Sequence, residues 1–174
     1  MILIGLTGPA GCGKDTVGQI LCDRAGFTRI AFADPIKRMV RQLGIETDNR
    51  DTKEQPIDWL GRSPRYLMQT LGTEWGRNMV HPELWLMLAE REIKHNGGHT
   101  VITDVRFDNE ADLIHKNGGV VWKISRRQVN AVERHASESG VNAENIDRYI
   151  VNNGTIADLT DEVLLTLTND WALA

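Results

Sequence analysis

Short apolar runs alternate along the chain with longer segments of helical periodicity. The runs typical of buried strands are 2–6, 27–32, 99–104, 120–124 and 149–153. Segments with apolar residues every three or four positions are 17–24, 35–41, 63–79, 82–96, 108–116 and 157–168. Strands that alternate with helices are typical of α/β proteins. The pattern therefore predicts an α/β fold.

The first predicted strand leads directly into a glycine-rich turn, Gly8 to Gly13, which is followed by Lys14, Asp15 and Thr16. A strand, a glycine turn with lysine and then a helix is the arrangement of a phosphate-binding loop. Its backbone N–H groups and helix N-terminus form an anion nest, and the lysine ammonium reaches the outer phosphates. The spacing fits the Walker A motif, except that Asp15 stands where the motif has the Ser or Thr that binds Mg²⁺. Thr16, one residue later, is a candidate to serve a phosphate or a metal-bound water.

A dinucleotide-binding fingerprint is the main alternative for this turn. In that interpretation Asp34, about twenty residues downstream, would bind the ribose. The fingerprint needs a further glycine where Thr16 stands, and it gives Lys14 no role. The phosphate-binding loop is therefore the stronger prediction.

Charged residues gather where predicted strands end, which is the edge at which open α/β sheets bind ligands. Lys37 and Arg38 follow the second strand, and Asp104 ends the third. A carboxylate at that position is suited to hold Mg²⁺ or its water. After the fourth strand, a polar segment from about 126 to 148 begins with two arginines. We interpret it as a short flexible lid, although a plain charged loop would have a similar composition.

The segment 63–79 predicts the most informative helix. Two i+4 rows run along it, an apolar row of Leu67, Leu71, Trp75 and Met79 and a polar row of Arg65, Gln69, Thr73 and Arg77. The rows lie on opposite faces of an α-helix, so one should pack while the other faces solvent or a cleft. Gly72 and Gly76 each cost about 1 kcal/mol relative to alanine inside a helix. We therefore expect a ligand, another helix or a partner chain to approach them closely.

Composition narrows the class of protein. With 174 residues, 41% of them hydrophobic and 25% charged, the chain can bury a substantial core. The net charge of −4 argues against a non-specific nucleic-acid binder, and no apolar run approaches the roughly 20 residues of a membrane span. The N-terminus lacks the basic region of a signal peptide. Cys12 and Cys22 offer no disulfide framework, so we expect a reducing cytoplasm. Residues 44–61 are polar and irregular, and we assign them no chemistry.

Taken together, these segments resemble the deoxynucleoside monophosphate kinases typical of bacteriophages, within the nucleoside monophosphate kinase superfamily. The motifs that carry the resemblance are GPAGCGKDT (8–16), FADPIKR (32–38), RYLMQTLGTEWGR (65–77), TDVRFDNEA (103–111), RHASE (134–138) and NNGT (152–155). The resemblance implies one P-loop kinase domain over 1–174, a three-layer α/β sandwich around a five-stranded parallel sheet. It also implies a helical acceptor-binding region at about 35–97 and a short lid at about 126–148.

The reaction that the resemblance implies is transfer of the γ-phosphoryl group of ATP, with Mg²⁺, to a deoxynucleoside 5′-monophosphate, which would supply DNA precursors. Such a transfer depends on positioning and cationic clamps. Because the acceptor phosphate is already an anion, no strong general base is needed, and Asp104 is expected to bind Mg²⁺ or water. A small-molecule substrate is implied, with no nucleic-acid polymer and no membrane, and a homodimer is left open.

The resemblance also implies roles for individual residues. The nucleotide is expected to contact Gly11, Cys12, Gly13, Lys14, Asp15, Thr16, Asn153 and Thr155, of which Asn153 and Thr155 would meet the adenine. The metal candidates are Asp15, Thr16 and Asp104. The catalytic candidates are Lys14, Asp104, Arg126 and Arg127. The acceptor is expected to contact Asp34, Lys37, Arg38, Arg65, Gln69, Arg106 and Arg134, with Arg65 and Arg106 on its phosphate and Gln69 on a base edge.

Two other classes of protein remain open at this point. One is a related P-loop kinase of another phosphorylated small molecule, such as dephospho-coenzyme A. The other is a regulatory module that binds a nucleotide without transferring a phosphoryl group. Such a module would keep Lys14 but would not need the arginines near 65, 106 and 126, so their presence favours catalysis. A GTPase is disfavoured because the chain lacks an Asn-Lys-x-Asp guanine motif.

Overall fold

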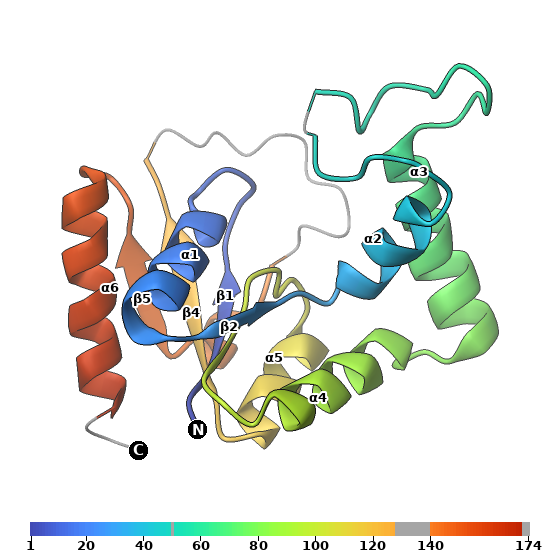
Figure 1. Ribbon diagram of the computed structural model, residues 1–174. Helices are drawn as coiled ribbons and strands as arrows, with labels where there is room; N and C mark the ends of the chain where they lie inside the picture. The colour runs from blue at the N-terminus through green and yellow to red at the C-terminus, as the bar shows by residue number, and fades with distance from the viewer. Residues whose placement is uncertain (50, 128–139, 172–174) are drawn as a thin grey trace. The chain divides into compact units, whose positions relative to one another are not determined.

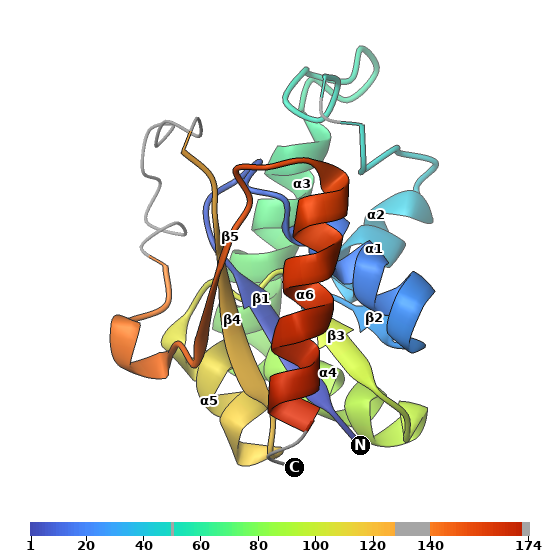
Figure 2. The same cartoon turned by 90° about the vertical axis from the view of Figure 1, so that its left-hand side faces the viewer.

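A computed structural model describes residues 1–49, 51–127 and 140–171. Its strands are β1 (Leu3–Thr7), β2 (Thr28–Ile30), β3 (Thr100–Ile102), β4 (Val120–Ser125) and β5 (Arg148–Val151). They form one five-stranded sheet in the order β2-β3-β1-β4-β5, and every neighbouring pair is parallel. Figure 1 shows the fold, and all five strands are labelled in Figure 2. The predicted parallel sheet is confirmed, with each strand within two residues of its apolar run.

Helices supply the connections between the first four strands. The α-helices are α1 (Lys14–Ala25), α2 (Asp34–Arg41), α3 (Pro64–Gln69), α4 (Leu84–Asn96), α5 (Asp108–Lys116) and α6 (Ile156–Trp171). A π-helix, η1 (Thr70–Val80), continues α3, and a single 3-10 turn, η3 (Ala143–Asn145), precedes β5. Among the described residues, no helix is long and apolar enough to span a membrane.

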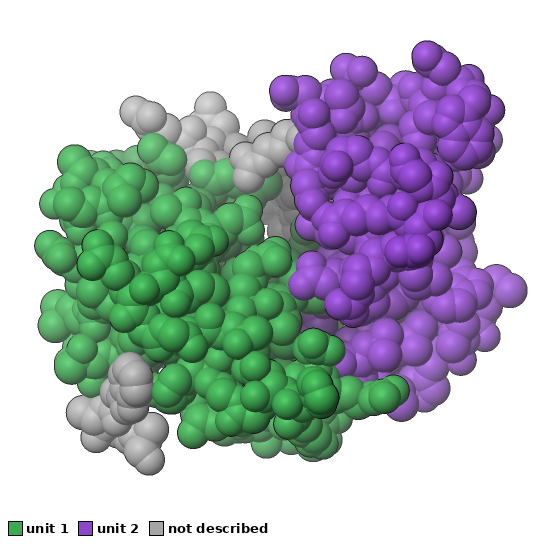
Figure 3. All heavy atoms as spheres, viewed as in Figure 1, with its two compact units in different colours: residues 1–31, 90–174 green, residues 32–89 purple. Residues whose placement is uncertain are grey.

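The chain divides into two compact units, coloured separately in Figure 3. Unit 1 comprises residues 1–31 and 90–174 and carries the whole sheet. Unit 2 comprises residues 32–89, with α2, α3, η1 and the start of α4. The predicted acceptor-binding region, about 35–97, overlaps unit 2, and its role in binding stays a prediction.

Unit 1 has three layers. Alternate strand residues point to opposite faces of the sheet. On one face, Leu6 and Ile124 join a buried cluster with Val17 of α1 and Val163 of α6. On the other face, Gly5 lies so close to Ile114 of α5 that a Cβ at residue 5 would collide with that side chain. Figure 2 shows α6 lying across the first of these faces. The predicted three-layer sandwich is therefore confirmed.

The helix predicted over 63–79 begins as expected but changes its hydrogen-bond register. Ser63 caps α3 by accepting a bond from the Tyr66 N–H at 3.2 Å. From Thr70 onward the chain is a π-helix, which ends where the His81 N–H donates to the Gly76 oxygen five residues earlier, at 3.0 Å. The i+4 apolar row does not stay on one face of this wider helix. The prediction that the apolar row packs is wrong for its second half, because Trp75 is 38% exposed and Met79 is 78% exposed.

Trp85 of α4 explains the two glycines in this helix. Its ring occupies the space that a Cβ at Gly76 would need, and its Nε1 donates to the Gly72 oxygen at 2.8 Å. Trp85 is 4% exposed and therefore belongs to the buried core. The close approach at Gly72 and Gly76 is thus made within unit 2. These glycines no longer give a reason to expect a ligand or a partner chain there.

Candidate functional site

The turn between β1 and α1 has the backbone of an anion nest. Gly8, Gly11 and Gly13 have φ values of 137°, 79° and 107°, which residues with a Cβ rarely adopt. A Cβ at Gly8 would collide with the Ile124 oxygen, and one at Gly13 with the Asn152 side chain, whereas the space beside Gly11 is open. The α1 N-terminus follows at Lys14, so N–H groups of the turn and of the helix can converge on one anion.

Lys14 lies over its own loop. Its Nζ donates to the oxygens of Gly8 at 2.6 Å and Pro9 at 2.9 Å. Burial lowers the pKa of Lys14, and the Arg106 guanidinium acts in the same direction. Cys12 and the carboxylates of Asp15 and Asp104 raise the pKa of Lys14 and so oppose this shift. The charged groups predicted for phosphate and metal binding therefore surround this ammonium closely enough to influence its protonation.

The turn after β3, which carries Asp104 and Arg106, is held by Glu110. This carboxylate is 4% exposed and accepts hydrogen bonds from the N–H groups of Arg106 at 2.7 Å and Phe107 at 3.3 Å. The Val105 N–H also donates to the Leu6 oxygen at 3.1 Å. Glu110 has no role among the residues predicted from the sequence. Its position three residues after the helix N-cap could have indicated one, because a glutamate there can accept a hydrogen bond from the N-cap backbone N–H.

The metal candidates fit an ion shared with a bound nucleotide. Asp104 and Thr16 are half-buried and Asp15 is exposed. The buried Thr103 hydroxyl has no hydrogen-bond partner within the described ranges. In those ranges, no three His, Cys, Asp or Glu side chains gather as a metal cage. Mg²⁺ at nucleotide sites usually takes one or two carboxylates plus phosphates and waters, so the residues suit it. Their roles stay predictions.

The end of β5 faces the same loop. The Asn153 Oδ1 accepts a bond from the Arg127 N–H at 2.8 Å. The Thr155 hydroxyl donates to Asp158 at 2.8 Å and accepts from the Asp158 N–H at 3.2 Å, so Thr155 caps α6. The bonds from Thr155 lower the pKa of the Asp158 carboxyl. Contacts of Asn153 and Thr155 with adenine stay predictions. Arg126 and Arg127 are exposed beyond β4, and Arg134 lies outside the described residues.

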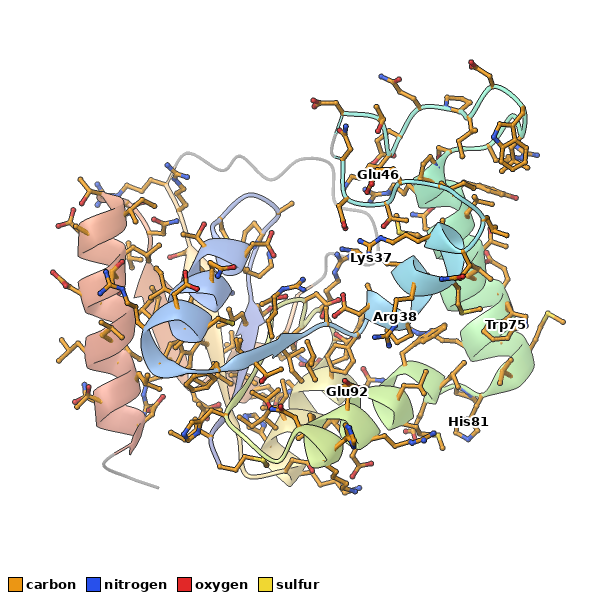
Figure 4. The ribbon with its side chains drawn as sticks, viewed as in Figure 1. Lys37, Arg38, Glu46, Trp75, His81 and Glu92 are labelled. Atoms are coloured by element: carbon orange, nitrogen blue, oxygen red, sulfur yellow. The ribbon has the colours of Figure 1, made fainter. Side chains whose placement is uncertain are left out.

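Unit 2 carries five of the seven predicted acceptor residues. Lys37 Nζ lies 3.0 Å from Asp48 Oδ1, and Arg41 pairs with the same carboxylate. The hydrogen bond from Lys37 lowers the pKa of Asp48. Glu46 supports this turn by accepting the N–H of Asp48 at 2.8 Å. Figure 4 labels Lys37, Arg38 and Glu46.

Arg65 of α3 is also engaged with a carboxylate. Its Nη1 lies 2.8 Å from Glu54 Oε1. The segment 44–61, to which the sequence analysis assigned no chemistry, therefore supplies the carboxylates for both Lys37 and Arg65. Asp34, Arg38 and Gln69 belong to the same unit, whereas the predicted acceptor residue Arg106 belongs to unit 1.

Comparison with known proteins identifies the relatives of this chain. A family model described as "Deoxynucleotide monophosphate kinase" matches residues 58–163. An Acanthamoeba polyphaga mimivirus protein named "Putative deoxynucleotide monophosphate kinase" is 34% identical over 190 aligned residues, covering 97% of each chain. The "Deoxynucleoside-5'-monophosphate kinase" of Escherichia phage T5 is 27% identical, covering 87% of this chain and 89% of its own length.

The fold has solved counterparts as well. A dephospho-CoA kinase from Campylobacter jejuni matches with a TM-score of 0.55 at 15% identity, over 97% of this chain and 96% of that one. At such low identity the likeness concerns the fold alone.

Proposed function

Because the chain belongs to the deoxynucleotide monophosphate kinase family, we propose that it transfers the γ-phosphoryl group of ATP to a deoxynucleoside 5′-monophosphate. The observation that carries this proposal is the loop of positive-φ glycines that ends at Lys14 on the α1 N-terminus. Around Lys14 lie the charges of Asp104 and Arg106. This arrangement supplies the positioning and charge neutralisation on which phosphoryl transfer depends.

On the donor side, the loop N–H groups and Lys14 would bind the triphosphate. Asp15, Thr16 and Asp104 would hold Mg²⁺, which when bound neutralises charge on the phosphates. The exposed Arg126 and Arg127 would stabilise the charge on the transferred group. As the bond between the γ-phosphorus and the ADP oxygen breaks, a bond to an oxygen of the acceptor phosphate forms. That oxygen is already anionic, so the site needs no strong base.

On the acceptor side, Arg65 and Arg106 are proposed to bind the substrate phosphate and Gln69 a base edge, with contributions from Asp34, Lys37 and Arg38. Arg65 and Lys37 already contact Glu54 and Asp48, and those carboxylates are 55% and 54% exposed. Exposed ion pairs contribute about 0–1 kcal/mol. A doubly charged phosphate can therefore replace either carboxylate at little cost.

A substrate screen tests the proposal. ADP release from Mg-ATP is measured with dGMP, dTMP, dCMP and dAMP, with their ribose counterparts, and with dephospho-coenzyme A. Turnover on any deoxynucleotide above the background without acceptor supports the proposal and identifies the base. Turnover on the coenzyme precursor alone would replace the substrate. If ATP binds but no acceptor is phosphorylated, the chain is a nucleotide-binding module instead.

The lowered pKa of Lys14 predicts a specific alkaline limit for ATP binding. Between the lowered value and the ordinary 10.5, the folded chain has released a proton that the unfolded chain still holds. The contribution of Lys14 to stability therefore rises with pH in that window, while the ammonium that binds phosphate is lost. We expect the Kd for ATP to increase as the pH approaches 10.5. Calorimetric titration with ATP at a series of pH values measures this Kd for the unaltered protein and for Lys14→Met. The same increase of Kd at alkaline pH in both proteins would contradict the prediction.

A further inference from the structure

The side chain of Asn152 connects the end of β5 to the glycine-rich loop. Its Nδ2 donates a hydrogen bond to the main-chain oxygen of Cys12 at 2.9 Å. Asn152 is 7% exposed and Cys12 is fully buried, so water does not compete for this bond. The contact joins residues 140 positions apart. It forms because the carboxyl ends of parallel strands meet at one edge of the sheet.

The sheet fixes the position of Asn152. Its backbone N–H donates to the Ser125 oxygen at 2.8 Å, which extends the pairing of β4 and β5. The next residue, Asn153, accepts the Arg127 N–H at 2.8 Å. The backbone around Asn152 is therefore held by hydrogen bonds at residues 152 and 153. A side chain that positions a binding loop needs such a fixed backbone.

The Cys12 oxygen determines where the Gly13 N–H points. A trans peptide unit is planar, with its oxygen and N–H directed oppositely and its oxygen on the side of the following Cα. A Cβ at Gly13 would collide with the Asn152 amide, which places Asn152 on that oxygen side. The Gly13 N–H is therefore directed away from Asn152, next to the N-terminus of α1 at Lys14.

We infer that Asn152 is a positioning residue that holds the Cys12–Gly13 peptide so that its N–H faces the polyphosphate of the bound nucleotide. This inference rests on the proposed function for the identity of the ligand. If the amide donor is removed, the buried Cys12 oxygen loses this partner. The peptide can then rotate, and a carbonyl oxygen would meet the phosphate in place of an N–H donor.

Two substitutions distinguish the effect of the amide hydrogen-bond donor from the effect of side-chain shape. Asn152→Leu keeps similar volume without a donor, and Asn152→Asp keeps the shape but presents an acceptor to the Cys12 oxygen. Calorimetry measures the Kd of magnesium tripolyphosphate and of Mg-ATP. We expect both affinities to fall about tenfold in the leucine variant and about a hundredfold in the aspartate variant. Tripolyphosphate has no base or sugar, so a parallel loss assigns the effect to the phosphate nest.

Acid should partly rescue the aspartate variant. A protonated carboxyl again has a donor for the Cys12 oxygen, so its affinity relative to the unaltered protein should recover as the pH falls. A merely structural role predicts no such recovery. Asn117→Leu is the matched control, because the Asn117 Nδ2 donates to the Leu113 oxygen at 2.8 Å at the end of α5. That variant should bind both ligands normally.

An experiment on the unaltered protein tests the same inference and does not depend on whether the variants fold. In an NMR titration with tripolyphosphate, the Gly13 backbone amide and the Asn152 side-chain amide should shift with one midpoint. Normal affinities in folded Asn152→Leu, or an Asn152 amide that stays unshifted while Gly13 responds, would overturn the inference. A protein that phosphorylates no acceptor but needs Asn152 for tripolyphosphate refutes only the proposed function.

Discussion

Replacing Lys14 with methionine should lower kcat by about 10²- to 10³-fold, or about 3–4 kcal/mol, the range found when one preorganised donor to a transition state is removed. The ammonium follows the glycine turn directly and is the group that we propose meets the transferred phosphate. Methionine has similar length but no charge. Single-turnover measurements with saturating ATP and acceptor report this loss separately from any loss of affinity.

The stability of the Lys14→Met protein should change little. Burial lowers the pKa of Lys14, so the ammonium pays a desolvation cost that methionine avoids, while its bonds to the Gly8 and Pro9 oxygens are lost. Lys94→Met is the matched control, because Lys94 is 66% exposed and pairs only with Glu90 among the described residues. That variant should keep normal turnover. Near-normal turnover in Lys14→Met would instead show that the loop does not bind the transferred phosphate.

Local pattern was enough to predict the sheet and the loop. The apolar run of β1 is buried throughout because helices cover both faces of the sheet. The glycine turn was recognisable because the φ values of Gly8, Gly11 and Gly13 are a property that glycine alone supplies readily. Parallel direction is consistent with the crossover helices, whereas the strand order β2-β3-β1-β4-β5 is known only from the folded chain.

The parts that could not be predicted depend on contacts between distant residues. Gly72 and Gly76 signalled a close approach, but nothing in their periodicity identified Trp85 as the group that makes it. The change to a π-helix shifts every bond by one residue without altering the composition. Likewise, the sequence does not indicate that Asp48 pairs with Lys37 or that Glu54 pairs with Arg65, because each pair is brought together by the fold.

Asn152 is the clearest example of this limit. Sequence placed it at the end of a strand next to Asn153, the residue that we predicted to contact the nucleotide. Its bond to Cys12 depends on the lateral order of the strands and on the register of β5 against β4. A register shift by one residue would turn Asn153 inward in its place, so only the folded sheet distinguishes the two asparagines.

Replacing Trp85 with alanine should have the largest effect on stability, about 3–5 kcal/mol, which is typical for removal of a large buried aromatic side chain. The ring fills the space beside Gly76 and bonds the Gly72 oxygen, so the cavity would open at the centre of unit 2. Trp85→Phe should cost less, about 1–3 kcal/mol, because it removes the hydrogen bond to the Gly72 oxygen and part of the ring beside Gly76 but keeps the rest of the aromatic side chain. Urea unfolding followed by far-UV circular dichroism measures both values.

Trp59→Ala is the matched control, because Trp59 belongs to the same unit but is 70% exposed. Its unfolding free energy should stay within about 0.5 kcal/mol of the unaltered protein. The glycine-rich loop belongs to unit 1. Under conditions where Trp85→Ala remains folded, it should therefore retain its ATP affinity while the KM for the acceptor rises. Equal stabilities of Trp85→Ala and Trp59→Ala would contradict the assigned core. An unchanged acceptor KM in Trp85→Ala would mean that unit 2 does not form the acceptor site.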